Sequence, residues 1–341
     1  MDWSKLLPEL LDVILGKLTE FTDHLRFRCV CRSWLSAAKS HRMPRSLPWL
    51  YLPQNPTTTI LRFYSFSENK VYKIPFPEAQ DSETEVVGSA SGFMLIVGHG
   101  ENPKALMTNP FTGTKVHLPY STNHAQDIQW DYSGSIVVAN HECYNGGVYC
   151  RPGDRSWPGV DALADCWIHR IVYKAGSFYV LDDNTPVFYV LDDKMLNLTR
   201  IIQIPQYDPK NCQLFVSPDE ILLSTHYYSH QKKLDLLCFN LNSSLQESSW
   251  TKVTDLGNYA LFYYETYGMY WDYKFNFLFE ARQHTGLRNT IISYRLSPFH
   301  KDTMTCYIDA HNLTATNELT DAKCFYPSYT PFWVPPNFDT A

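Results

Sequence analysis

The spacing of apolar residues changes once along this 341-residue chain, and that change limits the folds that it can adopt. Residues 1–40 repeat leucine and isoleucine at three- and four-residue steps, as a helix with one apolar face does. Residues 57–341 instead hold short apolar segments rich in β-branched and aromatic types, as strands do. Four prolines between residues 41 and 56 predict a stiff, extended connector. We therefore expect an α+β chain with a small helical domain (1–40), a connector (41–56) and an all-β domain (57–341).

The N-terminal segment predicts three short helices. Pro8 suits the first turn of a helix, because the backbone N–H groups of that turn have no intrahelical acceptor to lose. Thr22 or Asp23 can cap the second helix, and Trp34 begins the third. Helices this short bury too little surface to be stable alone. Their apolar side must be completed either by the rest of the chain or by another protein, and spacing alone does not separate these two interpretations.

Residues 2–15 and 25–34 together resemble an F-box. The pattern of that family has a Leu-Pro opening, a leucine and isoleucine stripe and a Val-Cys-x-x-Trp close, and this chain matches the three parts in order. The resemblance implies docking on the Skp-family adaptor of a cullin-RING ubiquitin ligase, and through it on a cullin. Some of the matching side chains must pack inside the motif, and Trp34 is either an interface anchor or the pin of the three-helix core. Carried over by position, the adaptor-binding residues are Leu7, Pro8, Leu10, Leu11, Ile14, Leu15, Leu18, Leu25, Val30, Cys31 and Trp34.

A weak repeat runs through the β segments. Residues 67–75, 109–119 and 197–205 each combine a turn, a cation, an outgoing strand and a closing proline; residues 250–257 lack the proline, and residues 155–158 look like a degenerate copy. These units follow one another at about 40 to 50 residues, which is the length of a propeller blade. Strands at this period, without helices to cover a parallel sheet, favour radial four-stranded blades. We expect a β-propeller of five or six blades, with paired β-sandwiches as the alternative.

Several segments of the β domain resemble the KIB-type body of plant F-box proteins, long catalogued as domain of unknown function 295. They are residues 88–93, 109–113, 172–179, 250–253 and 256–262. Together with the F-box, this resemblance implies the substrate-recognition subunit of an SCF-type (Skp adaptor, cullin, RING) E3 ubiquitin ligase. The F-box would dock the adaptor, and the β domain would bind the protein to be ubiquitinated, which the sequence does not identify. The chain would then be no enzyme and would need no cofactor.

Chemical motifs in the β domain are few. Residues 88–92 have the spacing of a nucleophile elbow but carry alanine where the attacking hydroxyl would stand, which favours a β-turn. The Asp pairs at 182–183 and 192–193 follow strands, where turns favour Asp. Aromatic residues crowd positions 259–273, mostly as core, and any that project from loops would anchor a protein partner. No catalytic or metal-binding set is expected. The alternatives to a ligase subunit are a non-degradative interaction module and a propeller hydrolase or ligand-binding protein.

Composition disfavours several other classes. Residues 1–50 carry eight Lys and Arg against five Asp and Glu, which leaves 21 against 30, or a net charge of −9, for the rest. Phosphate binding needs a basic face, so we expect no nucleic acid partner. No stretch reaches the 18 or so apolar residues of a membrane span, and the signal-peptide pattern is lacking. Nine scattered cysteines indicate a reducing compartment with none bridged. We therefore expect a soluble intracellular protein of the nucleus or cytoplasm, with no membrane partner.

Overall fold

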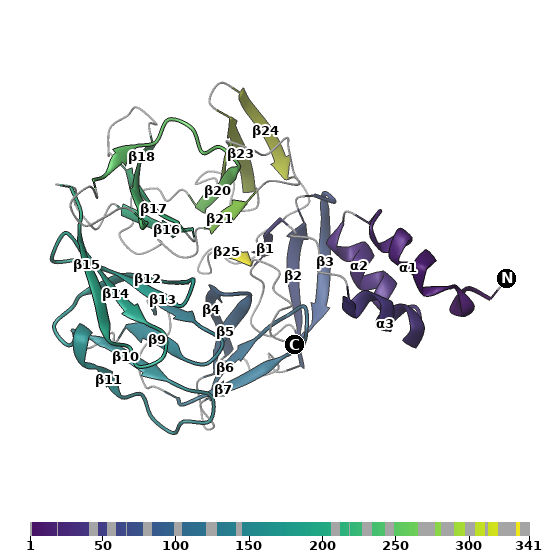
Figure 1. Ribbon diagram of the computed structural model, residues 1–341, viewed down its shortest axis with the longest axis horizontal. Helices are drawn as coiled ribbons and strands as arrows, with labels where there is room; N and C mark the ends of the chain where they lie inside the picture. Colours follow the sequence, from purple (N-terminus) through teal and green to yellow (C-terminus); the bar gives the residue numbers. More distant parts are fainter. Residues whose placement is uncertain are drawn as a thin grey trace.

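Helices come first along the chain, and strands make up most of the remainder (Figure 1). The computed structural model describes residues 2–18, 20–40, 47–52, 59–65, 67–77, 84–98, 104–120, 128–140, 145–205, 212–217, 219–226, 234–242, 249–264, 277–280, 290–296, 304–310, 313–319 and 332–334. The N-terminal helical elements are η1 (Trp3–Lys5), α1 (Pro8–Leu15), α2 (Phe21–Arg28) and α3 (Arg32–Ser40).

The starts of the first two helices follow different rules. Helix α1 begins at Pro8, as predicted. Helix α2 begins at Phe21, and its N-cap residue Glu20 makes no side-chain capping bond, so the prediction that Thr22 or Asp23 caps this helix is wrong. The start of α2 is instead set by a tertiary contact. Phe21 is 2% exposed and belongs to a hydrophobic core of the β domain, which fixes the start of the helix ahead of the predicted caps.

In the described part of the chain, the strands form five four-stranded sheets and one five-stranded sheet, which we name A to F. Hydrogen bonds join the strands of each sheet in the following order. Sheet A holds β25 (Phe332–Val334), β1 (Trp49–Leu52), β2 (Ile60–Ser65) and β3 (Lys70–Pro75). Sheet B holds β4 (Thr84–Ala90), β5 (Phe93–Gly98), β6 (Lys104–Thr108) and β7 (Lys115–Leu118). Sheet C holds β8 (Trp130–Tyr132), β9 (Val137–Asn140), β10 (Gly147–Cys150) and β11 (Gly159–Val160).

The second half of the β domain repeats this arrangement. Sheet D holds β12 (Ile168–Lys174), β13 (Ser177–Asp182), β14 (Val187–Asp192) and β15 (Leu198–Gln203), and a short 3-10 helix, η4 (Asp161–Leu163), precedes it. Sheet E holds β16 (Cys212–Val216), β17 (Glu220–His226), β18 (Leu234–Asn240) and β19 (Thr251–Lys252). Sheet F orders β21 (Phe277–Glu280), β20 (Tyr259–Tyr264), β22 (Thr290–Leu296), β23 (Met304–Ala310) and β24 (Leu313–Leu319). Neighbouring strands are antiparallel except β20 and β22.

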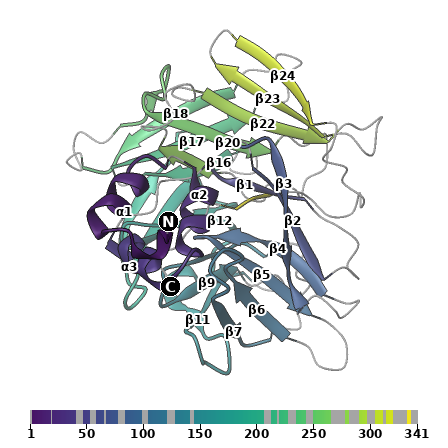
Figure 2. The same ribbon diagram turned by 90° about the vertical axis from the view of Figure 1, so that its right-hand side faces the viewer.

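The sheets are arranged radially, as the blades of a propeller. The edge strands β25, β4, β8, β12, β16 and β21 contact one another in turn, so one edge of every sheet faces a common centre (Figures 1 and 2). Hydrophobic clusters lie between neighbouring sheets, one each between A and B, B and C, C and D, D and E, and E and F. The predicted fold, a small helical domain followed by an all-β propeller, is confirmed, and the sandwich alternative does not describe these sheets.

Sheet A joins the two ends of the β domain. Strand β1 pairs with β2 on one side and with the C-terminal strand β25 on the other, where Trp49 lies opposite Val334. Strand β1 falls within the predicted connector, so the prediction of an extended linker over residues 41–56 is corrected at 49–52, a buried strand. The side chains of β1 are buried and its backbone gains hydrogen bonds on both edges, and together these outweigh the effect of the nearby prolines. Residues 41–46 and 53–56 of that prediction lie outside the described residues.

The weak sequence repeat corresponds to one position in the fold. Residues 67–75, 109–119 and 197–205 contain β3, β7 and β15, and each of these is the edge strand of its sheet farthest from the common centre. The copy without a closing proline contains β19, and the degenerate copy precedes β11, a strand of two residues in the same position. The repeat therefore marks the last strand of successive blades.

None of the helices in the described part of the chain combines the length and the apolar content needed to cross a lipid bilayer.

Candidate functional site

The helical segment has a small core of its own. Leu11, Leu15, Phe27 and Ala38 are buried together, from three different helices. Half-buried side chains pack around them: Leu6, Ile14, Leu18, Trp34 and Ala37. Leu11 and Leu15 are four residues apart and therefore lie on one side of α1, which faces α3. This side of α1 is closed by the other helices.

Trp34 pins this core from α3. Its ring lies 4.4 Å from the ring of Phe27, centroid to centroid. Its indole N–H donates a hydrogen bond of 3.0 Å to the carbonyl oxygen of Trp3, and the Ser33 hydroxyl donates one of the same length to the carbonyl oxygen of Ser4. These bonds hold η1 against the start of α3. Trp34 thus has the second of the two roles that the sequence left open, that of a pin within the helical core.

An apolar surface remains open on the same helices. Of the eleven large hydrophobic side chains that are exposed in the described part of the chain, six lie within the first 40 residues. We call them the open apolar surface: Leu7 (63% exposed), Trp3 (59%), Val13 (56%), Val30 (51%), Leu10 (48%) and Leu35 (37%). Large apolar side chains exposed in this number within 40 residues are typical of an interaction site, because water is a poor solvent for them.

The structure sorts the predicted adaptor-binding residues into three groups. Leu7, Pro8, Leu10 and Val30 are exposed. Leu11 and Leu15 are buried in the helical core, beneath the open apolar surface. The remaining five are half-buried: Ile14, Leu18, Leu25, Cys31 and Trp34. Of these, Leu25 packs against the cluster between sheets A and B.

Three members of the open apolar surface were missed from the sequence: Trp3, Val13 and Leu35. A signal for Val13 was available. Leu7, Leu10 and Val13 recur at three-residue steps, so α1 carries a second apolar stripe beside the stripe that enters the core. Helix α1 therefore carries apolar side chains beyond those that fill the helical core.

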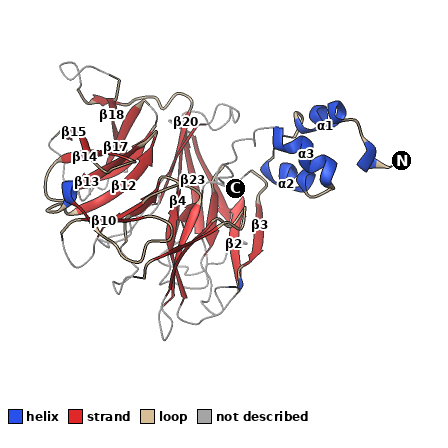
Figure 3. Ribbon diagram, turned by 60° about the horizontal axis from the view of Figure 1, so that its bottom comes forward, coloured by secondary structure: helices blue, strands red, loops and turns tan. Residues whose placement is uncertain are grey.

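The other side of the helical segment is closed by the β domain. Helix α2 lies next to β3, and the N-terminus lies on the far side of the helices (Figure 1). Helices α1, α2 and α3 group beside the strands rather than among them (Figure 3). Phe21 and Leu25 of α2 pack against the cluster between sheets A and B. The β domain therefore covers part of α2, and the open apolar surface stays exposed in this chain.

The first member of each acidic pair in the β domain serves a turn. Asp182 accepts hydrogen bonds from the backbone N–H groups of Trp167 (3.0 Å) and Asn184 (3.1 Å). Asp192 likewise accepts bonds from three backbone N–H groups of the β14–β15 turn, and these bonds lower the pKa of its carboxyl. The interpretation as turn formers is confirmed for these two residues, whereas Asp193 accepts a bond of 2.8 Å from the Tyr173 hydroxyl.

Residues 88–92 likewise end in a turn. Ser91 and Gly92 connect β4 and β5 with φ of 50° and 84°, which is typical of a tight hairpin. The turn interpretation is confirmed here too, and the resemblance to a nucleophile elbow does not extend beyond the spacing.

One buried acid connects three blades. Asp131 on β8 of sheet C accepts hydrogen bonds from the Ser91 hydroxyl of sheet B (2.9 Å) and from the backbone N–H groups of Tyr132 (2.7 Å) and Tyr173 of sheet D (2.7 Å). Burial raises the pKa of Asp131 to about 6, against the effect of these bonds and of the Arg170 charge. Its donors come from the protein itself, and its role is to join neighbouring sheets.

The described residues hold no group of three or more His, Cys, Asp or Glu placed to bind a metal ion. Six cysteines in the described part of the chain are free thiols: Cys29, Cys31, Cys150, Cys166, Cys212 and Cys238. Of the aromatic run at 259–273, residues 265–273 lie outside the described residues.

A three-helix segment followed by a β-propeller is an architecture that defines a class of protein. Comparison with protein families agrees with this class. A model described as "F-box domain" matches residues 3–46, and one described as "KIB1-4 beta-propeller" matches residues 63–274, more than half of the chain. The chain belongs to the KIB1-4 β-propeller family and is a plant F-box protein with a C-terminal propeller. Both resemblances seen in the sequence are confirmed.

Relatives extend over most of the chain. A putative F-box protein of Arabidopsis thaliana is 25% identical, with 76% of this chain and 77% of the relative covered. An F-box/kelch-repeat protein of the same plant is 26% identical, with 76% of each chain covered. Among solved structures, TolB from Acinetobacter baumannii is similar with a TM-score of 0.48 and 12% identity, over 92% of this chain and 72% of that one.

Proposed function

We propose that this protein is the substrate-recognition subunit of an SCF-type E3 ubiquitin ligase in the nucleus or cytoplasm. The F-box binds a Skp-family adaptor, and through it a cullin, while the propeller binds the protein to be ubiquitinated. The chain contributes binding and position, and the transfer chemistry belongs to the other subunits. The observation that supports this proposal most directly is the open apolar surface on the F-box helices, on segments that the propeller does not cover.

The open apolar surface has the properties of a protein interface. Leu10 and Val13 are held in place because Leu11 and Leu15, on the buried side of the same helix, fix α1 in the helical core. A preorganised apolar surface loses little conformational entropy on binding, so more of the burial free energy contributes to affinity. Trp3 and Leu7 are the most exposed of the six and are the best candidates for anchors in pockets of the adaptor.

Capture of a purified Skp adaptor by the full-length protein tests this proposal. We expect Leu7→Ala combined with Pro8→Ala to weaken capture and to leave the propeller folded. The matched control is Met195→Ala combined with Leu198→Ala, which removes exposed apolar side chains from the outer part of sheet D instead. Unchanged capture by the first double variant, or equal loss by the control, would remove the assignment of the adaptor surface.

Degradation is tested separately. A receptor for ubiquitination shortens the lifetime of its target, whereas a non-degradative interaction module binds the adaptor without that effect. Proteins retained by the propeller under proteasome inhibition supply candidate targets. The half-life of each candidate should lengthen when the wild-type protein is replaced by the Leu7→Ala, Pro8→Ala variant, and an unchanged half-life for every retained protein would favour the non-degradative module.

A further inference from the structure

Helix α2 of the F-box inserts an aromatic side chain between two blades of the propeller. The Phe21 ring meets the rings of Trp49 and Phe111 edge-on, with centroids 5.8 and 5.6 Å away. Trp49 belongs to sheet A, and Phe111 lies in the β6–β7 turn of sheet B. Trp49 in turn stacks on Tyr72 of β3 at 4.7 Å. Edge-to-face aromatic pairs are directional as well as apolar, so this contact fixes an angle in addition to a distance.

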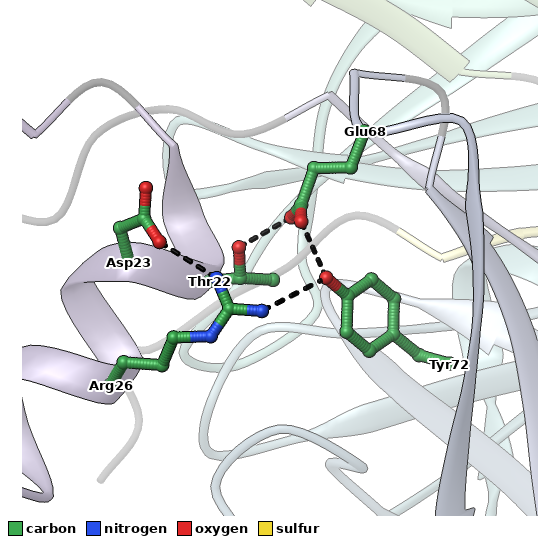
Figure 4. Close-up of polar contacts among 5 residues, drawn as sticks. All are labelled: Thr22, Asp23, Arg26, Glu68 and Tyr72. Atoms are coloured by element: carbon green, nitrogen blue, oxygen red, sulfur yellow. Dashed lines mark hydrogen bonds and ion pairs between the residues drawn. The ribbon is translucent and has the colours of Figure 1, made fainter.

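A polar network surrounds the aromatic contact (Figure 4). The Glu68 carboxylate, in the β2–β3 turn, accepts hydrogen bonds from the hydroxyls of Thr22 on α2 and of Tyr72 on β3. Arg26 donates to the Tyr72 hydroxyl at 3.4 Å and pairs with Asp23 at 2.7 Å. Burial, followed by the bond to Glu68, raises the pKa of the Tyr72 phenol, so this hydroxyl keeps its proton and remains a donor. The network therefore connects one face of α2 to two elements of sheet A.

A short chain segment just before β1 is also buried. Leu47 and Pro48, which follow the helices in sequence, are buried immediately before β1 begins at Trp49. Domains that share only a small polar contact move relative to each other by default, whereas an apolar interface suppresses that motion. Here a buried ring, a polar network and a buried chain segment meet at the same blade, so three attachments of different kinds join the helices to sheet A.

We propose that α2 and sheets A and B form a rigid joint that fixes the direction of the open apolar surface relative to the propeller. Phe21, Thr22, Glu68 and Tyr72 are its positioning residues. The joint exists in the free chain, without any partner. Its role in ubiquitination rests on the proposed function: the joint holds a bound target at a set place relative to the adaptor, and ubiquitin transfer depends on that placement.

The joint is tested by a distance measurement on the full-length protein. Spin labels carried by unnatural amino acids at Lys17 and Lys194, both exposed, report the separation of the F-box from sheet D without using the native cysteines. Phe21→Ala removes the ring between the blades. Thr22→Val combined with Tyr72→Phe removes both donors to Glu68 and leaves the packing volume nearly unchanged. Lys73→Ala is the control, because Lys73 is next to Tyr72 on β3 and its side chain points to the opposite face of the sheet.

We expect one narrow distance peak for the wild type and for Lys73→Ala. Phe21→Ala and the Thr22→Val, Tyr72→Phe variant should each lose that peak and give a broad distribution. A narrow, unshifted peak in both variants would overturn the proposal. If Phe21→Ala unfolds the helices, seen as loss of helical circular dichroism, the double variant decides alone by the same criterion.

Ubiquitination of a captured target gives the second measurement. In variants that lose the joint, the rate of ubiquitin transfer to the target should fall on the order of tenfold. The affinities for the adaptor and for the target should stay at their wild-type values. An unchanged rate in a variant with a broadened distance distribution would overturn the positioning role. Failure of the wild-type chain to bind any Skp adaptor would instead contradict the proposed function, and the distance measurement on the free chain would still decide the joint.

Discussion

The indole N–H of Trp250 donates a hydrogen bond of 2.7 Å to the carbonyl oxygen of Gln203, and so connects the last strand of sheet E with the last strand of sheet D. The same relationship occurs two blades earlier. Trp157, which precedes the last strand of sheet C, donates to the carbonyl oxygen of Pro119 at the end of sheet B, at 2.8 Å. Both tryptophans occupy the repeated sequence unit, so the repeat encodes a contact between the outer edges of neighbouring blades.

Trp250→Phe should lower the free energy of unfolding by about 1 to 2 kcal/mol, through the lost hydrogen bond and the smaller apolar contact with Phe239 and Phe188. Chemical denaturation followed by circular dichroism measures this change. Trp167→Phe is the matched control, because that side chain is 52% exposed. An equal effect of the two substitutions would show that the indole bond to Gln203 contributes nothing of its own.

Neighbouring leucines of α1 should respond in opposite ways to truncation. Leu11→Ala leaves a cavity in the helical core and should destabilise the F-box by about 2 to 5 kcal/mol. Leu10→Ala removes an exposed side chain and should leave stability within about 0.5 kcal/mol. We expect Leu10→Ala to weaken adaptor binding, measured by calorimetry, with the thermal transition of the helices unchanged. Loss of helical stability in Leu10→Ala would contradict the division between core and open apolar surface.

Asp131 should make one part of the propeller more stable as the pH falls. Burial raises its pKa to about 6 from the ordinary value of 3.8, so the folded state binds the proton more tightly than the unfolded state does. Its contribution to stability is therefore fully present below a pH of about 4 and is lost as the pH rises through about 6. The unfolding free energy of the wild type minus that of Asp131→Asn should increase as the pH is lowered from about 7 to about 4.

Urea denaturation of both proteins across this pH range measures that difference. Because the other titrating groups are common to the two proteins, their contributions cancel in the subtraction. A difference that stays constant, or that shrinks toward low pH, would contradict the raised pKa of Asp131.

A glycine in the β12–β13 turn should tolerate substitution poorly. Gly176 has φ of 82°, where a Cβ is strained, so Gly176→Ala should cost about 1 kcal/mol of stability. Gly159 of β11 lies outside that backbone region, and a Cβ there would meet no atom within 4 Å. Gly159→Ala should therefore be neutral or slightly stabilising, by less than about 1 kcal/mol. Thermal denaturation of the two variants makes the comparison, and the reverse order of stability would contradict it.

Local patterns predicted the elements better than their connections. The strand segment at 177–181 is found as β13, and Pro8 begins α1 as expected. The start of α2 was misplaced because Phe21 is held by Trp49 and Phe111, residues that are distant in the sequence. The connector prediction is wrong at β1 for a related reason: the partner strand β25 lies at the other end of the β domain.

The kinds of element, the blade period and the two family resemblances can be read from the sequence, because periodicity, turn residues and short motifs are properties of neighbouring residues. Which apolar side chains of the F-box are open and which are buried depends on how the helices pack. On α1, Leu10 and Leu11 are adjacent and alike in chemistry, and the packing of α3 on one side of the helix alone separates them. Burial depends on partners brought together by the fold, and no local pattern contains them.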